Sequence, residues 1–315
     1  MDWALAAAGF GVGVVVGLTG MGGGALMTPI LVLFFGIPPL AAVSSDLVAS
    51  AVMKPVGSAV HIRRGRVDWR LVAWLCAGSI PAAFGGVLVS KALGNGAGVQ
   101  EVVRIALGVA LLLAVAGLVL RAYLRLRNPG ADSGEQGVRR VKVRPLPTLV
   151  LGAVGGLVVG MTSVGSGSLI IVALLALYPM LRPNDLVGTD LVQAVPLVGA
   201  AAVGHLLFGD FQFDLTTALL AGSIPGVFIG AQISSRAPGA IVRRALGIVL
   251  LASALKLLHA SNTVLIAGVA AAIVLAPLAW MALRRSAGLP AIAPRKRTGA
   301  PAVAERPELV SAAAD

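Results

Sequence analysis

The stretch Gly17-Leu-Thr-Gly-Met-Gly-Gly-Gly-Ala-Leu26 recurs later in the chain as Gly160-Met-Thr-Ser-Val-Gly-Ser-Gly-Ser-Leu169. Each copy joins two apolar segments at a place where a membrane helix should be continuous. Glycine in a helix interior costs roughly 1 kcal/mol relative to alanine, so the adjacent glycines at 22–24 indicate a break in the helix. The backbone groups that such a break frees are tolerated in a bilayer only where protein or a wet cavity satisfies them.

A helix that restarts after such a break directs its positive N-terminal end at that cavity, which suits an anion. Close packing of membrane helices is the alternative explanation, because small residues let helices approach. Packing motifs need neither adjacent glycines nor neighbouring hydroxyls, so we favour breaks that face a ligand. The residues expected to bind the ligand at the breaks are Thr19, Gly22, Gly23, Gly24, Thr162, Ser166, Gly167 and Ser168.

The composition is that of an all-α integral membrane protein. Of the 315 residues, 57% are hydrophobic and 12% are charged, and the mean hydropathy is +0.94. A globular domain has about 25% charged residues, and the apolar runs here have the length of about 20 residues that a helical span needs. The net charge of +12 lies mainly in short loops between apolar runs, which favours a positive-inside bias over nucleic-acid binding.

The two copies of the glycine-rich stretch belong to a longer duplication. After one inserted residue, the halves of the chain align at a constant offset in which three further segments match in order. The matched segments are Asp46-Leu-Val with Asp190-Leu-Val, His61 with His205, and Ala77-Gly-Ser-Ile-Pro81 with Ala221-Gly-Ser-Ile-Pro225. Each half therefore holds one helical hairpin broken at glycine and three full spans.

The boundaries follow from this duplication and from the hydrophilic stretches. We expect the first transmembrane repeat at 1–124, a basic cytoplasmic linker at 125–146, the second transmembrane repeat at 147–260, an extra transmembrane helix at 261–284 and a disordered cytoplasmic tail at 285–315.

Corresponding loops of the two repeats carry opposite charge. The loop at 62–70 has four arginines against one aspartate, a net charge of +3, and the loop at 209–214 has a net charge of −2. The positive-inside rule places the first loop in the cytoplasm and the second outside. We therefore expect inverted repeats in a cell inner membrane, with the N-terminus outside, the C-terminus in the cytoplasm and the substrate near the midplane between the repeats.

The combined motifs resemble the sulfite exporter TauE/SafE family of membrane permeases over about residues 5–258. The resemblance implies a permease that moves sulfite, an organosulfonate or a related small anion, and it fixes neither the substrate nor the direction. The motifs that carry it are Gly17-Leu-Thr-Gly-Met-Gly-Gly-Gly24, Ser44-Ser-Asp46, Gly65-Arg-Val-Asp-Trp69, Gly78-Ser-Ile-Pro81, Gly160-Met-Thr-Ser-Val-Gly-Ser-Gly167, Thr189-Asp190 and Gly222-Ser-Ile-Pro-Gly226.

Charged residues also lie inside the apolar spans. Lys54 is about halfway along its span, where a charge costs roughly 2.5–3.5 kcal/mol on the insertion scale. Asp46, Ser50 and Lys54 are spaced to share one helix face. Either Asp46 and Lys54 form an internal pair bridged by Ser50 or water, or Lys54 is the counter-charge for an anion. We include Ser45, Lys54 and Gln193 among the expected substrate-binding residues.

Two aspartates and two histidines recur at equivalent positions of the repeats. Asp46 and Asp190 either fix the hairpins as structural caps or carry protons for coupling. His61 and His205 lie near span ends, where an interfacial role and a proton-relay role are the two alternatives.

The sequence predicts a secondary transporter that exports a small sulfur-containing anion, such as sulfite or an organosulfonate, by alternating access. The alternatives are a permease or importer for another small anion, and a membrane scaffold or sensor that transports nothing. We find no metal-ligand cluster, nucleophile–base pair or Walker motif, so we expect no enzyme activity, no cofactor and no metal. The expected partners are a small anion, the lipid bilayer and a coupling proton or cation. The sequence leaves open whether the chain forms a homodimer.

Overall fold

The computed structural model describes residues 2–19, 23–63, 65, 67–94, 96–127, 142–167, 169–178, 181, 183–233 and 239–286. Within these residues the chain forms eleven helices and no strand, which confirms the predicted all-α class. The helices are α1 (Trp3–Thr19), α2 (Gly24–Phe34), α3 (Pro39–Arg63), α4 (Trp69–Leu93), α5 (Ala97–Arg127), α6 (Pro145–Thr162), α7 (Leu169–Leu177), α8 (Pro183–Phe208), α9 (Phe213–Ile233), α10 (Gly239–Leu257) and α11 (Asn262–Ser286).

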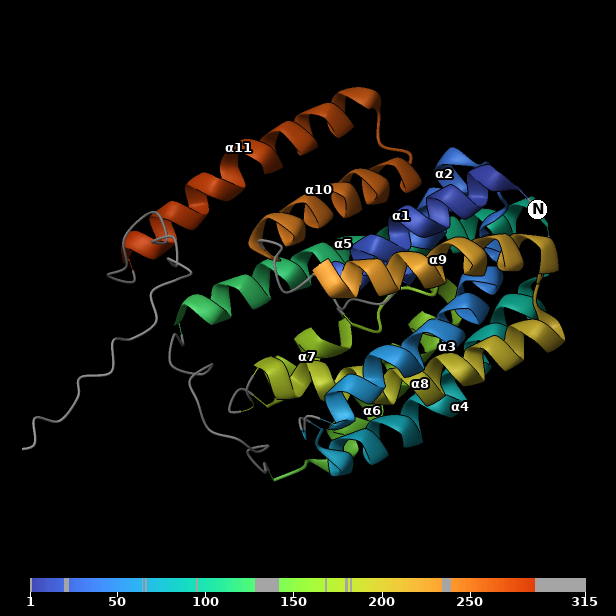
Figure 1. The fold of residues 1–315 in the computed structure, drawn as a ribbon, viewed down its shortest axis with the longest axis horizontal. Coiled ribbons are helices and arrows are strands. Elements are labelled where there is room, and N and C mark those ends of the chain that lie inside the picture. The colour runs from blue at the N-terminus through green and yellow to red at the C-terminus, as the bar shows by residue number, and fades with distance from the viewer. Residues whose placement is uncertain are drawn as a thin grey trace, which may run out of the picture.

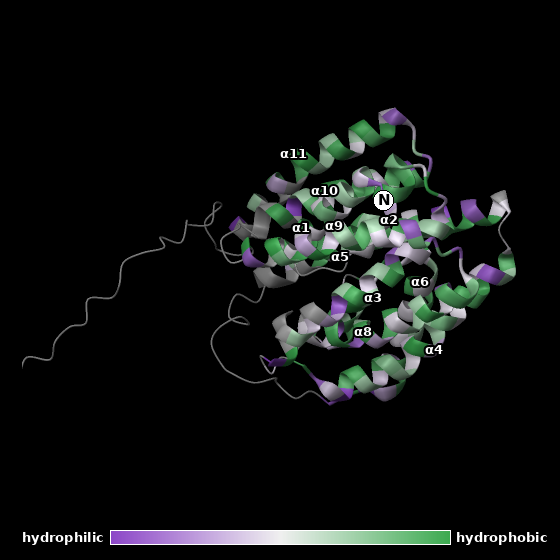
Figure 2. Ribbon diagram, turned by 45° about the vertical axis from the view of Figure 1, so that its right-hand side comes forward, coloured by the Kyte–Doolittle hydropathy of each residue, from purple (hydrophilic) through white to green (hydrophobic). Residues whose placement is uncertain are grey.

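Several of these helices have the length and apolar surface that a bilayer requires. Among the described residues, five helical segments are long and apolar enough to cross a membrane. They are Trp69–Leu93, Gly98–Leu120, Pro145–Thr162, Gly188–Phe208 and Phe213–Gly230. Large apolar side chains on the outside are exposed, and hydrophilic residues gather near the helix ends (Figure 2). Such a surface suits contact with lipid, which solvates apolar groups along the helix sides.

The chain turns back on itself at each glycine-rich break. In the second half, a side chain added to Gly155 of α6 would meet Ile170 of α7. The open end of this hairpin is closed by Tyr178, whose hydroxyl hydrogen-bonds Thr148 Oγ1 at 2.5 Å and accepts from the backbone N–H of Arg144 at 2.8 Å. These bonds satisfy groups at the start of α6, so the hairpin of α6 and α7 returns to the end from which it began.

The hairpin of the first half has the same form. Its second arm, α2, lies against α3 in the opposite direction, because Gly23 is near Ser50 while Thr28 contacts Asp46. In both halves the chain therefore forms a helical hairpin at the break.

The first helix of each half packs on the fourth helix of the other half. In the pair α1 and α9, a side chain added to Gly222 would meet the carbonyl oxygen of Ala6. In the pair α4 and α6, a side chain added to Gly78 would meet the carbonyl oxygen of Leu149. Glycine lets the two backbones touch at these points. The glycine-rich faces of α1, α4, α6 and α9 are therefore packing surfaces that cross between the halves.

Several other helix contacts are also matched between the halves. At the centre, α3 packs antiparallel on α8, because Ser44 bonds His205 while Ser58 bonds the carbonyl oxygen of Leu191. Helices α5 and α10 contact each other, α2 contacts α10 as α7 contacts α5, and α11 lies on α10 (Figure 1). When the two halves are exchanged, each contact named here maps onto itself or onto another of them, except that of α11.

The helix ends divide into two groups at opposite ends of the bundle. The N-terminus and the connection from α8 to α9 lie at one end, on the right in Figure 1. The connection from α3 to α4 and the last turn of α11 lie at the other end. The predicted linker at 125–146 falls between α5 and α6, and residues 128–141 lie outside the described residues, as does the tail from 287 to 315.

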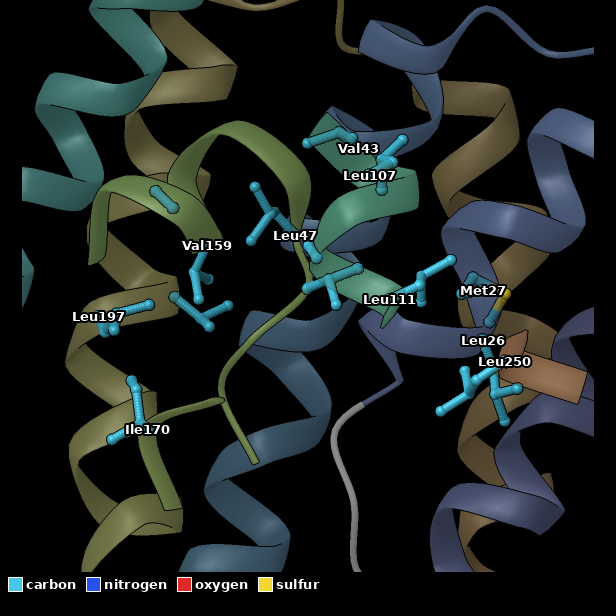
Figure 3. Close-up of a cluster of buried hydrophobic side chains, with 14 of the residues drawn as sticks. Leu26, Met27, Val43, Leu47, Leu107, Leu111, Val159, Ile170, Leu197 and Leu250 are labelled. Carbon is cyan, nitrogen blue, oxygen red and sulfur yellow. The ribbon is translucent and has the colours of Figure 1, made fainter. Parts of the chain in front are cut away.

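One apolar core joins the two halves. It contains Val43 and Leu47 of α3 together with buried residues from both hairpins and from the helices around them (Figure 3). The other labelled residues are Leu26, Met27, Leu107, Leu111, Val159, Ile170, Leu197 and Leu250. This core surrounds the region in which the broken helices meet.

Candidate functional site

The two broken hairpins touch each other. A side chain added to Gly24, the first residue of α2, would fall on the carbonyl oxygen and the hydroxyl of Ser163, directly after α6. Ser163 has a left-handed backbone with φ of 59°, and Gly165 and Gly167 follow with φ of 131° and 101°. Glycine adopts these angles without a steric penalty. The second break is therefore a turn whose geometry uses its glycines, and it rests on the start of α2.

Both breaks lie beside the middle of α3. The nearest atoms to a side chain added at Gly23 would belong to Met53, Val16 and Ser50, at 3.5–3.9 Å. From the same part of α3, Lys54 donates a hydrogen bond to Ser166 Oγ in the second break at 2.5 Å. Lys54 is only 7% exposed. A buried ammonium from one half of the chain is thus bound to the broken helix of the other half.

Asp46 connects the two hairpins through a single oxygen. Its Oδ2 accepts hydrogen bonds from Thr28 Oγ1 of α2 at 2.9 Å and from Ser163 Oγ at 2.5 Å. The side chain is completely buried. Its other oxygen, Oδ1, has no hydrogen-bond partner, and Ser50 lies close enough to interact with the carboxyl, although its hydroxyl makes no hydrogen bond of normal geometry. Asp46 therefore fixes the position of α2 relative to the second break.

Lys54 lies in the field of both membrane aspartates. Asp190 of α8 and Asp46 of α3 both attract its ammonium. Asp190 is completely buried, and its Oδ1 accepts a hydrogen bond from Gln193 Nε2 at 3.1 Å. Opposite charges attract strongly where water is excluded. The ammonium of Lys54 is thus shared by the buried aspartates of both halves.

Gln193 extends this polar cluster to α4. Its Oε1 accepts a hydrogen bond from Ser79 Oγ at 3.4 Å, and Ser79 belongs to the repeated Gly-Ser-Ile-Pro motif. The hydroxyl of Thr189, one residue before Asp190, accepts the backbone N–H of Asp68 at 3.1 Å. The polar residues of α8 therefore contact α4 on one side and α3 on the other.

His205 bridges three helices away from the breaks. Its Nε2 donates to the carbonyl oxygen of Gly160 in α6 at 2.8 Å. In the neutral ring, Nδ1 is then an acceptor, and it lies 2.8 Å from Ser44 Oγ of α3. His205 is 1% exposed, so both bonds are shielded from water. This geometry is that of a residue that pins α3, α6 and α8 together.

The chain matches a known family over almost the whole described bundle. The family model described as Sulfite exporter TauE/SafE covers residues 5–257. The chain belongs to this family.

Three named relatives align with most of this TauE/SafE chain. It is 37% identical to the probable membrane transporter protein YjnA of Bacillus subtilis over 259 residues, which are 79% of this chain and 97% of the relative. It is 24% identical to the probable membrane transporter protein YdhB of the same organism over 75% of this chain and 92% of the relative. A probable membrane transporter protein of Xylella fastidiosa is 24% identical over 81% of this chain and 94% of its own length. No solved structure gives a significant match.

Within this TauE/SafE fold, most of the predicted site residues come together at the breaks. Gly23, Gly24, Asp46, Lys54 and Ser166 lie around the middle of α3. Gln193 and Asp190 reach the same region from α8. Gly167 is buried in the second break, and Ser45 is buried with a hydroxyl that has no hydrogen-bond partner.

The other predicted residues have different positions. Thr162 bonds the carbonyl oxygen of Val158 at 2.6 Å and accepts the N–H of Val164 at 3.2 Å, so its hydroxyl serves the end of α6. Thr19 ends α1 and His61 is in α3, and the side chains of both lie outside the description. Gly22 and Ser168 fall outside the described residues altogether.

Sequence reasoning missed three members of the TauE/SafE cluster. Thr28 is the only hydroxyl residue in α2, and this isolation in an apolar helix was a usable signal. Ser163 stands in the second break where the first break has Gly20, so the repeat itself gave no reason to select it. Ser79 lies in a motif that was recognised as repeated but not as a source of polar contacts. No group of three or more metal-ligating side chains occurs in the described part of the chain.

Proposed function

We propose that this chain is a secondary transporter that exports a small sulfur-containing anion, such as sulfite or an organosulfonate, by alternating access. The observation that carries the proposal is the hydrogen bond from the buried ammonium of Lys54 to Ser166 in the second break. It puts a positive charge where both hairpins meet, in a chain of a family whose named relatives are probable membrane transporters.

The cluster has the donors that a tetrahedral or pyramidal oxyanion needs. Lys54 supplies an ammonium with three donors, and Ser166 supplies a hydroxyl. Helices α2 and α7 both begin at the breaks, and the N-terminal end of a helix carries a partial positive charge. Charge-assisted hydrogen bonds are about twice as strong as neutral ones. Together these groups offset the free energy that a sulfonate or sulfite loses when its hydration shell is removed on entry.

Two features of the bundle support alternating access. The antiparallel packing of α3 on α8 and the matched contacts of the halves fit an inverted repeat. In transporters of that plan, one bundle rocks against the other around a fixed midplane site. We place the basic connection between α3 and α4, together with the C-terminus, in the cytoplasm, and the N-terminus outside an inner membrane.

The proposal assigns roles to residues in three parts of the fold. Lys54 holds the anionic group, Ser166, Gly167 and Ser168 bind it from the second break, and Gly22, Gly23 and Gly24 bind it from the first. Gln193 holds Asp190 beside Lys54 while the site is empty.

Transport in proteoliposomes tests the proposal. Efflux of radiolabelled sulfite or sulfoacetate should occur with wild-type protein and stop in Lys54→Met. Lys91→Met is the matched control, because Lys91 lies over the ring of Phe208 near the end of α4 and its ammonium is outside the cluster. If Lys54→Met does not fold, the double variant Lys54→Met/Asp190→Asn, which removes both charges of the pair, is used in its place.

Two results would contradict the proposal. Wild-type efflux in a folded Lys54 variant would show that Lys54 does not bind the transported anion. No transport of any sulfur oxyanion, together with no thermal stabilisation by them, would favour a membrane scaffold or sensor.

A further inference from the structure

The carboxyl of Asp46 is held by hydroxyl groups from both hairpins. Its hydrogen bonds come from neutral hydroxyls of Thr28 and Ser163, both on Oδ2. The ammonium of Lys54 is bonded to Ser166 and is attracted by both Asp190 and Asp46. Asp46 is therefore a completely buried acid whose nearest hydrogen-bond partners carry no charge.

The charges in the middle of the bundle leave an excess of one negative charge. Among the described residues, the fully buried charged side chains at this level are Asp46, Asp190 and Lys54. When all three are ionised, two carboxylates face one ammonium. An unbalanced charge in a medium of low dielectric constant costs several kcal/mol. Protonating one carboxyl balances the cluster, and Asp46 is the carboxyl that accepts hydrogen bonds from both hairpins.

The hydrogen bonds of Asp46 accommodate a proton at one defined atom. Oδ1 is buried and has no donor, so the ionised carboxylate leaves it unsatisfied. A proton on Oδ1 gives that atom a group to donate, and the Ser50 hydroxyl one helical turn later is likewise buried without a hydrogen-bond partner. Oδ2 can still accept from Thr28 and Ser163. A bare metal cation would require several oxygen ligands beyond Oδ1 and Ser50, since oxygen-bound cations take about six.

The other titratable groups around Asp46 are few. Helices α2 and α7 contain none. Helix α8 contributes Asp190 and His205, the latter through Ser44 of α3. Helix α5 carries Glu101 and Arg104 near its start, and α9 carries Asp214 in its first turn. Lys54 is the charged group that interacts with Asp46 directly.

We propose that Asp46 is the site of an exchangeable proton that binds together with the transported anion. This rests on the proposed function, because the anion is taken to bind at Lys54. The anion adds a second negative charge to the cluster and so favours protonation of Asp46, and by linkage the proton favours anion binding equally. Protonation converts Oδ2 from a carboxylate oxygen to a carbonyl oxygen, which weakens its bonds to Thr28 and Ser163 and releases the two hairpins from each other.

Infrared difference spectra between acid and alkaline pH test the proton site without any ligand. The C=O stretching band of a protonated carboxyl, which is distinct from the bands of a carboxylate, should titrate in reconstituted wild-type protein. Asp46→Asn should lack that band and still fold, because its amide oxygen can accept from Thr28 and Ser163 and its NH₂ group can donate to Ser50. Asp190→Asn removes the carboxylate that shares Lys54 with Asp46, so it should keep the band but shift its titration to a more acidic pH. A band that persists in Asp46→Asn, or that disappears in Asp190→Asn instead, would overturn the proposal.

The linkage is measured with methanesulfonate, whose charge does not change between acid and alkaline pH. Its affinity for wild-type protein should rise as the pH falls, by up to about tenfold per pH unit, the limit for one linked proton. In Asp46→Asn the affinity should not depend on pH. An unchanged pH slope in this variant, or a slope that depends on sodium in place of protons, would contradict the coupling. Failure of all sulfur oxyanions to bind would end the proposed function, while the infrared assignment of Asp46 would stand on its own result.

Discussion

Gly24, the first residue of α2, lies directly against the backbone carbonyl and the hydroxyl of Ser163, at the end of α6. These two residues belong to different halves of the chain, and each follows a broken helix. Their contact, together with the bonds from Thr28 and Ser163 to Asp46, holds the two hairpins together.

Replacing Gly24 with alanine should separate the hairpins. The added carbon would overlap the Ser163 carbonyl oxygen, so a backbone must shift, and overpacking of this kind costs about 1–3 kcal/mol. Gly23→Ala is the control, since its added carbon would make only ordinary contacts at 3.5 Å or more. Thermal unfolding in detergent should show a lower midpoint for Gly24→Ala alone. Equal midpoints for the two variants would refute the close contact.

The pair of Lys54 and Asp190 should be strongly coupled. Lys54→Met leaves Asp190 without an opposite charge and should cost about 3–5 kcal/mol, whereas Asp190→Asn should cost less, because Asp46 still attracts Lys54. The double variant should be less destabilised than the sum of the two, because it leaves neither charge unpaired. A double-mutant cycle of unfolding free energies measures the coupling, and strictly additive effects would show that the two side chains do not interact.

The glycines between the halves should tolerate no side chain. Gly222→Ala in α9 and Gly78→Ala in α4 each place a carbon on the backbone of the facing helix, and each should destabilise the protein by about 1–3 kcal/mol. Gly85 is also in α4, but an added carbon there meets nothing within 4 Å. Gly85→Ala should therefore be neutral, or stabilising by up to about 1 kcal/mol through helix propensity. Unfolding midpoints of the three variants test this, and tolerance of alanine at 222 would contradict the packing described.

His205 should matter more for stability than the other described histidine side chain, His259. His205→Leu removes two buried hydrogen bonds and leaves the Ser44 hydroxyl and the Gly160 carbonyl unsatisfied, at about 1–3 kcal/mol for each group. His259 bonds Glu101 at 2.8 Å on the surface, where a pair contributes about 0–1 kcal/mol. Only the first variant should show a clearly lower unfolding midpoint. If His259→Leu were equally destabilised, the buried bridge would not be the cause.

The sequence was sufficient to predict the helical class and the positions of the breaks. Adjacent glycines in an apolar run cost too much in a continuous helix, and the helices do end at Thr19 and Thr162. The spacing of Asp46 and Lys54 on one face of α3 was also readable, because it depends on helix geometry alone.

The partners of these residues could not be predicted in the same way. Helix periodicity shows which side chains share a face but not which helix covers that face. The sequence left open whether Lys54 pairs with Asp46 or is the counter-charge for an anion, and it named no partner from the other half. The structure gives Lys54 a hydrogen bond to Ser166 and an attraction to Asp190 as well as to Asp46. Thr28 and Ser163 meet at Asp46 only because two hairpins from distant parts of the chain converge, and a one-dimensional pattern does not contain that information.

The crossed packing of the first and fourth helices has a consequence for biosynthesis. Helix α1 is the first to leave the ribosome, but its principal packing partner is α9, which is made near the end of translation. Until then the glycine face of α1 must rest against lipid or the insertion machinery. A chain severed in the linker between α5 and α6 would yield two fragments that become stable only when both are present in the same membrane.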